Sequence, residues 1–175
     1  PVWVAARSPI TYDYAIKNKC NVMSWPLTRP FSEAELYKKQ LDDAIANHKS
    51  SFKPIFAMMR HAAVYTNDSD KQKALNSIRT VLGQFENLFK NLGEVENGFT
   101  KQIPLNELEG REQYDPDMLT KNLLFGTPEE IIEKLKLYQN LGVDEFIYYA
   151  SMGLGHKEQQ KSLKLFIEEV MPEFA

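Results

Sequence analysis

The chain opens with the sequence VWVAARSPIT (Val2 to Thr11), in which a short apolar run passes directly into the start of a helix. The run from Val2 to Ala6 has the composition of a strand that is buried on both faces. Ser8 and Pro9 then form a pair that commonly begins a helix, since proline is tolerated at the first helical position. This stretch therefore predicts a strand followed closely by a helix, the repeating unit of parallel α/β proteins.

Three further apolar runs are typical of strands, and helical patterns separate them. The predicted strands cover residues 21–26, 54–65 and 145–150. The predicted helices cover residues 33–46, 70–92 and 128–141, and a last helix ends before Pro172. That last helix is expected to carry its apolar residues on one face, namely Leu163, Phe166, Ile167 and Val170.

Two of these helices begin with the pattern of a capping box, in which a Ser or Thr and a Glu three residues later bond to each other's backbone. The first pair is Ser32 with Glu35, and the second is Thr127 with Glu130. Pro128 strengthens the second prediction because it occupies the first helical position.

Strands that alternate with helices predict a parallel sheet with right-handed crossovers. Four such units fit either a small doubly wound sheet or half of a (β/α)8 barrel. A complete barrel needs about 250 residues, whereas this chain has 175. We therefore expect an α/β fold, half of a TIM (β/α)8 barrel, that forms a single partial domain over residues 1–175.

Residues 93–125 interrupt this alternation, and we interpret them as an insertion before the last unit. The stretch is polar, is broken by glycine and proline, and lacks clean periodicity. Long segments of this kind inside a compact domain are often lids or binding loops. We consider two alternatives for this segment, a lid and a plain solvated loop.

The composition excludes several classes of partner. A formal net charge of −3 provides no basic surface for nucleic acid or an anionic membrane. Cys20 is the single cysteine, so a disulfide within the chain is excluded, and the apolar runs are too short to cross a bilayer. The sequence therefore predicts a soluble, cytoplasmic chain. Because a strand begins with its first residues, we consider both a mature terminus and a piece of a longer protein.

The turn from strand to helix at Ala6, Arg7, Ser8 and Thr11 is a candidate phosphate site. A helix N-terminus presents free N–H groups and a partial positive charge, and the two hydroxyls and the guanidinium add donors. The alternative is that the Ser8 side chain merely caps the helix.

Other polar residues lie near the ends of predicted strands. Ser24 and Trp25 end the second strand, on the rim where barrel enzymes build their sites, and the indole could either wall a cofactor or pack. Arg60 and His61 must point to opposite faces of the third strand. We expect Arg60 either to pair with a carboxylate for structure or to act in catalysis, and His61 to be either a packing residue or a general acid or base. The spacing of the histidines predicts no metal site.

Several segments together resemble the bacterial luciferase-like flavin-dependent monooxygenases. They are PVWVAARSP (residues 1–9), residues 21–25, RHAAVY (residues 60–65), GTPEE (residues 126–130) with LGVD (residues 141–144), and residues 162–172. The resemblance covers nearly the whole chain, least so residues 93–125, and it rests on the order of the segments.

The resemblance implies the C-terminal half of a TIM barrel and a parent enzyme that oxidises a small organic substrate with reduced FMN and O2. It implies that Ser8 and Thr11 contact the FMN phosphate, with Arg7 and Ala6 beside them, and that Ser24 and Trp25 lie beside the flavin ring. Arg7 departs from true bacterial luciferase, where this position is acidic, so neither light emission nor an aldehyde substrate is implied.

The same resemblance leaves other outcomes open. The related deazaflavin-dependent oxidoreductases share the barrel, and a non-catalytic flavin-binding or interaction half-barrel is a further alternative. The catalytic residues belong to the first four units of the family, so this chain alone is expected to be inactive. A flavin reductase, and either a homo-oligomer or pairing with the missing N-terminal half, are the expected partners.

Overall fold

A computed structural model describes residues 1–89, 94–150 and 153–174 of the chain. The contacts divide it into two compact units. The first unit contains Pro1–Ala62 and Ile132–Tyr149, and the second contains Ala63–Ile131 and Ala150–Ala175. The two units are considered separately below.

The first unit is built on parallel strands that neighbour one another in chain order. Among the described residues this sheet has five strands, of which β6 (Leu124–Gly126) belongs to the second unit and pairs with β3. The four strands in the first unit are β1 (Trp3–Ala5), β2 (Asn21–Ser24), β3 (Phe56–Val64) and β7 (Glu145–Tyr149). Each pairs in parallel with the next. This order has no reversal, whereas a doubly wound sheet reverses its order at a switch point. With right-handed crossovers, an unreversed order places all connecting helices on one face, so the half-barrel prediction is confirmed and the doubly wound alternative is wrong.

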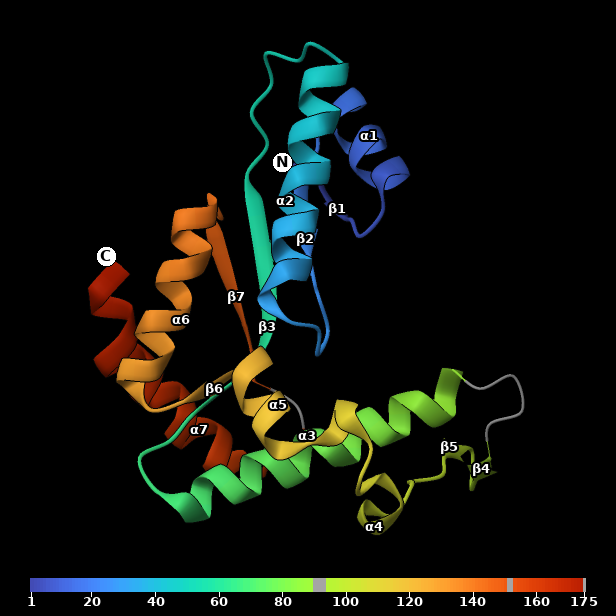
Figure 1. Ribbon diagram of the computed structural model, residues 1–175, viewed down its shortest axis with the longest axis vertical. Helices are drawn as coiled ribbons and strands as arrows, with labels where there is room; N and C mark the ends of the chain where they lie inside the picture. Colours follow the sequence, from blue (N-terminus) through green and yellow to red (C-terminus); the bar gives the residue numbers. More distant parts are fainter. Residues whose placement is uncertain (90–93, 151–152, 175) are drawn as a thin grey trace. The chain divides into compact units, whose positions relative to one another are not determined.

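The helices of this unit begin and end close to the predicted positions. They are α1 (Pro9–Lys17), α2 (Phe31–Asn47) and α6 (Pro128–Leu141), the last entering the unit at Ile132. The Tyr12 ring on α1 lies 6.4 Å from the Tyr37 ring on α2, so these two helices pack together beside β1 and β2 (Figure 1).

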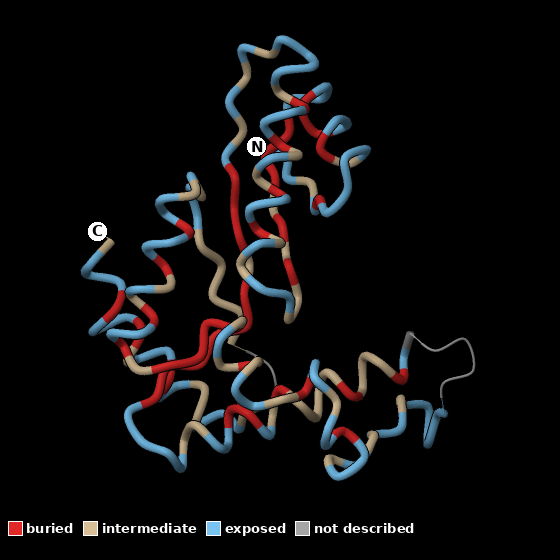
Figure 2. The backbone as a smooth tube through the Cα atoms, in the orientation of Figure 1, coloured by how far each residue is buried: buried red, intermediate tan, exposed pale blue. Residues whose placement is uncertain are grey.

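The two faces of the sheet differ in burial. Val22, Phe56 and Met58 point toward the helices and are buried, and β2 and β3 are red over most of their length in Figure 2. The opposite face is more open, since the Trp3 side chain is 39% exposed and Ala5 is also exposed. This second face is the side that lines the interior of a barrel.

Only one of the two predicted capping boxes forms. At the start of α6, Thr127 N–H donates to Glu130 Oε2 (2.8 Å) and Glu130 N–H donates to Thr127 Oγ1 (3.4 Å). The box at Ser32 is wrong because α2 begins earlier, at Phe31, with the extended Pro30 as its N-cap. Ser32 therefore lies inside the first turn.

The second unit contains the remaining elements, among them α3 (Asp68–Phe89) and α7 (His156–Leu165). Helix α3 begins two residues earlier than predicted, and its predicted end at Leu92 lies outside the described residues. Between α3 and α6 the described part of the expected insertion forms short elements. They are β4 (Val95–Glu96), β5 (Phe99–Thr100), α4 (Leu105–Leu108), η1 (Glu112–Tyr114), α5 (Pro116–Asn122) and β6 (Leu124–Gly126).

These short elements pack on α3 through specific contacts. Asn87 donates to the carbonyls of Glu94 and Lys101 (both 2.9 Å), which ties the hairpin formed by β4 and β5 to the helix. Leu108 is fully buried, and a Cβ atom at Gly83 would lie 3.1 Å from Leu108 Cδ1, so the close approach of α4 favours glycine there.

The predicted single face of the last helix is wrong. Helix α7 widens into a π-helical turn, η2 (Phe166–Val170), and then tightens into the 3-10 turn η3 (Met171–Phe174), which contains Pro172. A wider turn changes the angular spacing of the side chains. Phe166 and Val170 are consequently buried, whereas Leu163 and Ile167 are 40% and 50% exposed.

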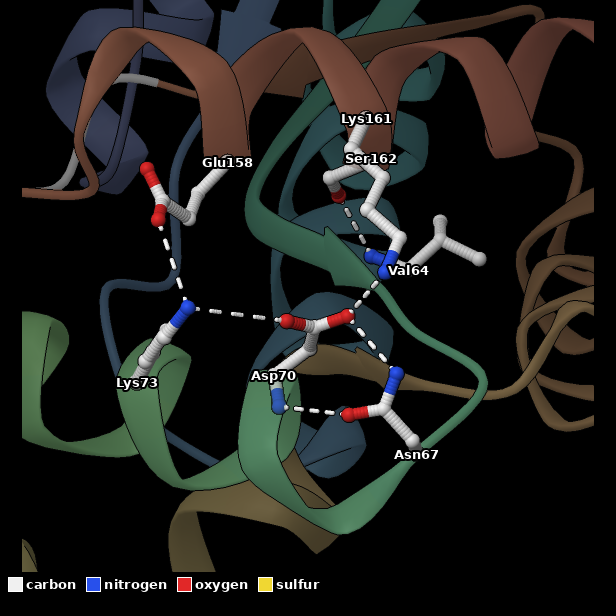
Figure 3. A network of polar contacts seen from close by, with 7 residues as sticks. All are labelled: Val64, Asn67, Asp70, Lys73, Glu158, Lys161 and Ser162. Atoms are coloured by element: carbon white, nitrogen blue, oxygen red, sulfur yellow. Dashed lines mark hydrogen bonds and ion pairs between the residues drawn. The ribbon is translucent and has the colours of Figure 1, made fainter.

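A polar network joins the start of α3 to α7 (Figure 3). Asp70 is hydrogen-bonded to Asn67 and forms an ion pair with Lys161, and Lys73 lies 3.3 Å from Glu158. Beside these exposed contacts, the buried Ser162 Oγ accepts a hydrogen bond of 2.7 Å from the Val64 N–H at the end of β3. Exposed ion pairs contribute little to stability, so the Ser162 bond is the contact that we expect to matter.

The substitution Ser162→Ala tests this expectation. It leaves the Val64 N–H buried without this acceptor, and we expect the free energy of unfolding to fall by about 2 kcal/mol in urea denaturation. Ser51→Ala, at an exposed loop position, is the matched control. Equal effects of the two substitutions on the free energy of unfolding would contradict a stabilising role for the Ser162 hydrogen bond.

No helix among the described residues is long and apolar enough to cross a membrane.

Candidate functional site

The N-terminus of α1 has hydroxyl groups that the helix itself does not use. Ser8 has the extended backbone of an N-cap, but its side chain accepts no capping hydrogen bond. The N–H groups of Thr11 and Tyr12 instead donate to the Ser8 carbonyl oxygen (3.0 and 3.2 Å). Ser8 Oγ lies 3.0 Å from Thr11 Oγ1, and this pair is exposed. The capping alternative for the Ser8 hydroxyl is therefore wrong, and both hydroxyls are accessible to a ligand.

This hydroxyl pair borders a pocket of about 530 Å³ in the first unit. A volume of this size is in the usual range for small-ligand sites. Of the predicted site residues, Ala6, Arg7, Ser8, Thr11 and Trp25 line it. The sequence did not single out its other lining residues, which are Ala5, Met23, Arg29, Glu33, Tyr37 and Met59.

The charges around the pocket favour an anion. Arg7 and Arg29 provide two guanidinium groups against the single Glu33 carboxylate, and the α1 N-terminus adds its partial positive charge. Burial raises the pKa of the Tyr37 hydroxyl, which Arg7 acts to lower and Glu33 to raise. Tyr37 is therefore a neutral hydroxyl placed between groups of opposite charge.

Ser24 lies on the other face of the sheet and does not line this pocket. It is buried, its Oγ donates to the Ala6 carbonyl (2.8 Å), and it lies 2.7 Å from the Tyr12 hydroxyl. Tyr12 also donates to the Ala6 carbonyl (3.2 Å), and burial raises the pKa of its hydroxyl. Ser24 therefore fastens the end of β1 to β2 and α1, which positions the turn that carries Arg7 and Ser8.

Arg60 faces the helices, and His61 lies on the opposite face of the sheet, where it is buried. The Arg60 guanidinium donates to the carbonyls of Leu27 (3.2 Å) and Arg29 (2.9 Å) and lies 5.9 Å from the centre of the Tyr138 ring. We predicted a carboxylate partner for Arg60, whereas these contacts of its guanidinium are with two carbonyl oxygens and an aromatic ring. Arg60 thus holds the loop after β2 in position.

His61 belongs to an aromatic cluster at the carboxyl ends of three strands. Its ring stacks on Tyr149 at 5.0 Å and meets Trp25 edge-on at 5.2 Å, and Trp25 also lies 5.6 Å from Tyr149. His61 and Tyr149 are paired in register across β3 and β7, so they point to the same face. The sequence named Trp25 and His61 but missed Tyr149. The signal that could have found it is its place at the end of the last strand.

The same cluster contains polar atoms without hydrogen bonds. His61 is fully buried, and neither of its ring nitrogens has a partner among the described residues; the same holds for Trp25 Nε1. Burial, and secondarily the Arg60 charge, lower the pKa of His61 to about 3, so the imidazole is neutral. No group of three or more metal-ligating side chains occurs in the described ranges.

Comparisons with known proteins agree with this fold. The chain is 31% identical over its whole length to the oxygenase component of a flavin-dependent trigonelline monooxygenase from Acinetobacter baylyi, of which it covers 49%. Among solved structures, it resembles the monooxygenase RslO1 from Streptomyces bottropensis with a TM-score of 0.64 and 18% identity, covering all of this chain and 49% of that one.

A third similar protein was solved with its cofactor. It is the oxygenating constituent of 3,6-diketocamphane monooxygenase from Pseudomonas putida, in complex with FMN, with a TM-score of 0.60 and 14% identity over 98% of this chain and 48% of that one. The chain thus spans about half the length of these relatives. The family model described as luciferase-like monooxygenase matches residues 1–145. The sheet order, the half-barrel likeness and this match establish that the chain belongs to the luciferase-like monooxygenase family.

Proposed function

We propose that this chain provides the phosphate-binding rim and part of the ring-facing wall of an FMN-dependent monooxygenase, which oxidises a small organic substrate with O2. The observation that carries the proposal is the exposed Ser8 and Thr11 hydroxyl pair, which caps nothing and borders a pocket with two guanidinium groups. A phosphate monoester accepts several hydrogen bonds and favours guanidinium donors and a helix N-terminus.

The residues of the pocket fit FMN in two parts. Ser8, Thr11 and Arg7 would hold the phosphate at the α1 N-terminus, with Ala6 at the base of the turn. Trp25, which lines the same pocket, would lie beside the flavin ring, and Ser24 would act only by holding the turn in place. When bound and reduced, the flavin would supply the electrons that activate O2 for transfer of one oxygen atom to the substrate.

The substrate class that we would test first is a small heteroaromatic acid. The relative from Acinetobacter baylyi is named for trigonelline, and it is 31% identical to this chain. The aromatic side chains of Trp25 and Tyr149 at the carboxyl ends of β2 and β7 are suited to contact a flat ring. Reduced flavin would come from a separate reductase, since the relative is the oxygenase component of its system.

We further propose that the chain acts with additional barrel strands and is inactive by itself. In the first unit, β1 and β7 each pair with one neighbour in the described sheet, so each leaves a strand edge for pairing. Those strands would come from the other half of a longer protein or from a second copy, and residues 93–125 would serve as a lid. The expected compartment is the cytoplasm.

A deazaflavin is the second candidate cofactor. An F420-dependent secondary alcohol dehydrogenase resembles this chain with a TM-score of 0.61 and 15% identity over 98% of this chain and 48% of that one. A flavin-binding half-barrel without catalysis is the remaining alternative. Binding of FMN without O2-dependent turnover of the heteroaromatic acid, measured on the chain together with its additional barrel strands and a flavin reductase, would favour it.

Replacing the hydroxyl pair tests the phosphate site. We expect Ser8→Ala with Thr11→Ala to weaken FMN binding about tenfold or more, since each lost bond would have been made to a charged phosphate. Quenching of flavin fluorescence measures the dissociation constant on the full chain.

Riboflavin, which lacks the phosphate, is the matched control for this pair of substitutions. Its affinity should be the same for the double variant and the unaltered chain. Unchanged FMN affinity would contradict the phosphate assignment, and an equal loss for both ligands would point to a general distortion of the pocket.

A further inference from the structure

The buried polar nitrogens of the aromatic cluster are unusual for a packing role. A buried donor or acceptor without a partner destabilises a fold by about 1–3 kcal/mol, so most such groups are hydrogen-bonded. His61 is fully buried with both ring nitrogens unpartnered among the described residues, and Trp25 Nε1 shares this condition. Phenylalanine would fill the same aromatic niche without that penalty. A hydrogen-bonding group from outside the described residues is therefore the simplest reason for histidine here.

The position of the cluster identifies where that group would sit. His61 and Tyr149 are in register at the carboxyl-terminal parts of β3 and β7, and Trp25 directly follows β2. All three side chains lie on the face away from the packed helices, and Trp25 also lines the pocket that contains the Ser8 hydroxyl. Sites in (β/α)8 barrels are built at the carboxyl ends of the strands, on this face.

We infer that His61 and Trp25 Nε1 form a polar anchor for the edge of a flat heterocyclic ligand ring, which Tyr149 and the indole contact through their aromatic surfaces. The indole nitrogen can only donate, whereas a neutral imidazole donates at one nitrogen and accepts at the other. The matching ligand edge therefore carries an acceptor, such as a carbonyl or carboxylate oxygen. Both the flavin ring and a heteroaromatic acid have this chemistry, and the inference rests on the proposed function for that choice.

The surroundings of His61 keep it a neutral anchor. Trp25 and Tyr149 face it from the end of β2 and from β7, and both contact it through their aromatic rings. The Arg60 guanidinium, its neighbour in β3, points to the helix face and opposes protonation of the imidazole. We therefore expect no proton uptake at His61 between pH 5 and 8 in the folded chain, consistent with its lowered pKa of about 3.

The substitution His61→Phe separates binding from packing. It keeps an aromatic ring against Tyr149 and removes the two unpartnered nitrogens, so we expect a higher midpoint of thermal unfolding together with roughly tenfold weaker ring binding. The probes are riboflavin and N-methylnicotinate, each titrated calorimetrically into the full chain. A loss for riboflavin alone assigns the anchor to the flavin, and a loss for N-methylnicotinate alone assigns it to the substrate.

The matched variant is His61→Gln, whose amide restores a donor and an acceptor. It should recover part of the affinity that His61→Phe loses, without its gain in stability. Affinities for both rings within twofold of the unaltered chain, or no measurable binding of either ring to the unaltered chain, would overturn the inference. Riboflavin has no phosphate, so the Ser8 site does not contribute to its binding. The results for His61 are therefore interpretable whether or not Ser8 binds the FMN phosphate.

A second measurement tests the neutral state directly. The unfolded chain protonates His61 near its ordinary pKa, whereas the folded chain does so near about 3, so stability falls as pH drops through that window. At pH 5, protonation of His61 in the unfolded chain raises the unfolding equilibrium constant roughly thirtyfold. We expect His61→Gln to remove this part of the acid sensitivity in urea titrations at pH 7 and pH 5. An unchanged dependence would show that His61 titrates normally and would overturn the neutral anchor.

Discussion

Successive side chains of a strand point to opposite faces of the sheet, and every assignment in the first unit depends on this alternation. Ser24 and Trp25 are adjacent in sequence, yet Ser24 is buried against α1 whereas Trp25 lines the open pocket. Arg60 and His61 divide in the same way between loop anchoring and the aromatic cluster. Because the strands follow chain order in parallel register, the alternation stays in phase from β2 to β7. Residues far apart in sequence consequently meet on one face.

The position of the turn at Ser8, our proposed phosphate site, follows from contacts on the opposite face. Ser24 and Tyr12 both donate to the Ala6 carbonyl, which fixes the last residue before the turn against β2 and α1. The Ser8 carbonyl in turn accepts the first N–H groups of the helix. With the backbone held by these bonds, the Ser8 and Thr11 hydroxyls are not needed to start α1. The buried hydroxyls of Ser24 and Tyr12 thus hold the turn in place, and the exposed Ser8 and Thr11 hydroxyls have no capping role.

The fold could be predicted from sequence more completely than the site. Apolar runs and helix-start signals located the four barrel strands to within about two residues, because burial and local capping depend on nearby residues. The same signals failed at Ser32, because α2 has its N-cap at Pro30, two residues earlier than the box requires. They also failed at Leu163, because a π-helical turn changes the phase of the apolar stripe. Both failures arise where the backbone departs from the regular period.

Assignment of the site needed the register of the sheet, which the sequence does not contain. Alternation predicted that Arg60 and His61 face opposite ways, but only strand pairing showed which of them joins Trp25. Tyr149 looked like one more apolar strand residue until its pairing with His61 placed it in the cluster. Arg29 and Glu33 come from the loop after β2 and from the first turn of α2, and their approach to Ser8 depends on the packing of α2 against α1.

The charge of the whole chain says little about the ligand of this pocket. The chain carries a net charge of −3, yet the pocket combines two guanidinium groups, one carboxylate and a helix N-terminus. Interactions between exposed charges fade beyond about 10 Å at ordinary salt, so the distant acidic residues are screened from a phosphate at Ser8. Glu33 lines the pocket itself and is therefore not screened. It acts to raise the pKa of Tyr37, which Arg7 acts to lower. Two guanidinium groups against one carboxylate leave the pocket lining with an excess of one positive charge, which favours a small anion such as a single phosphate group.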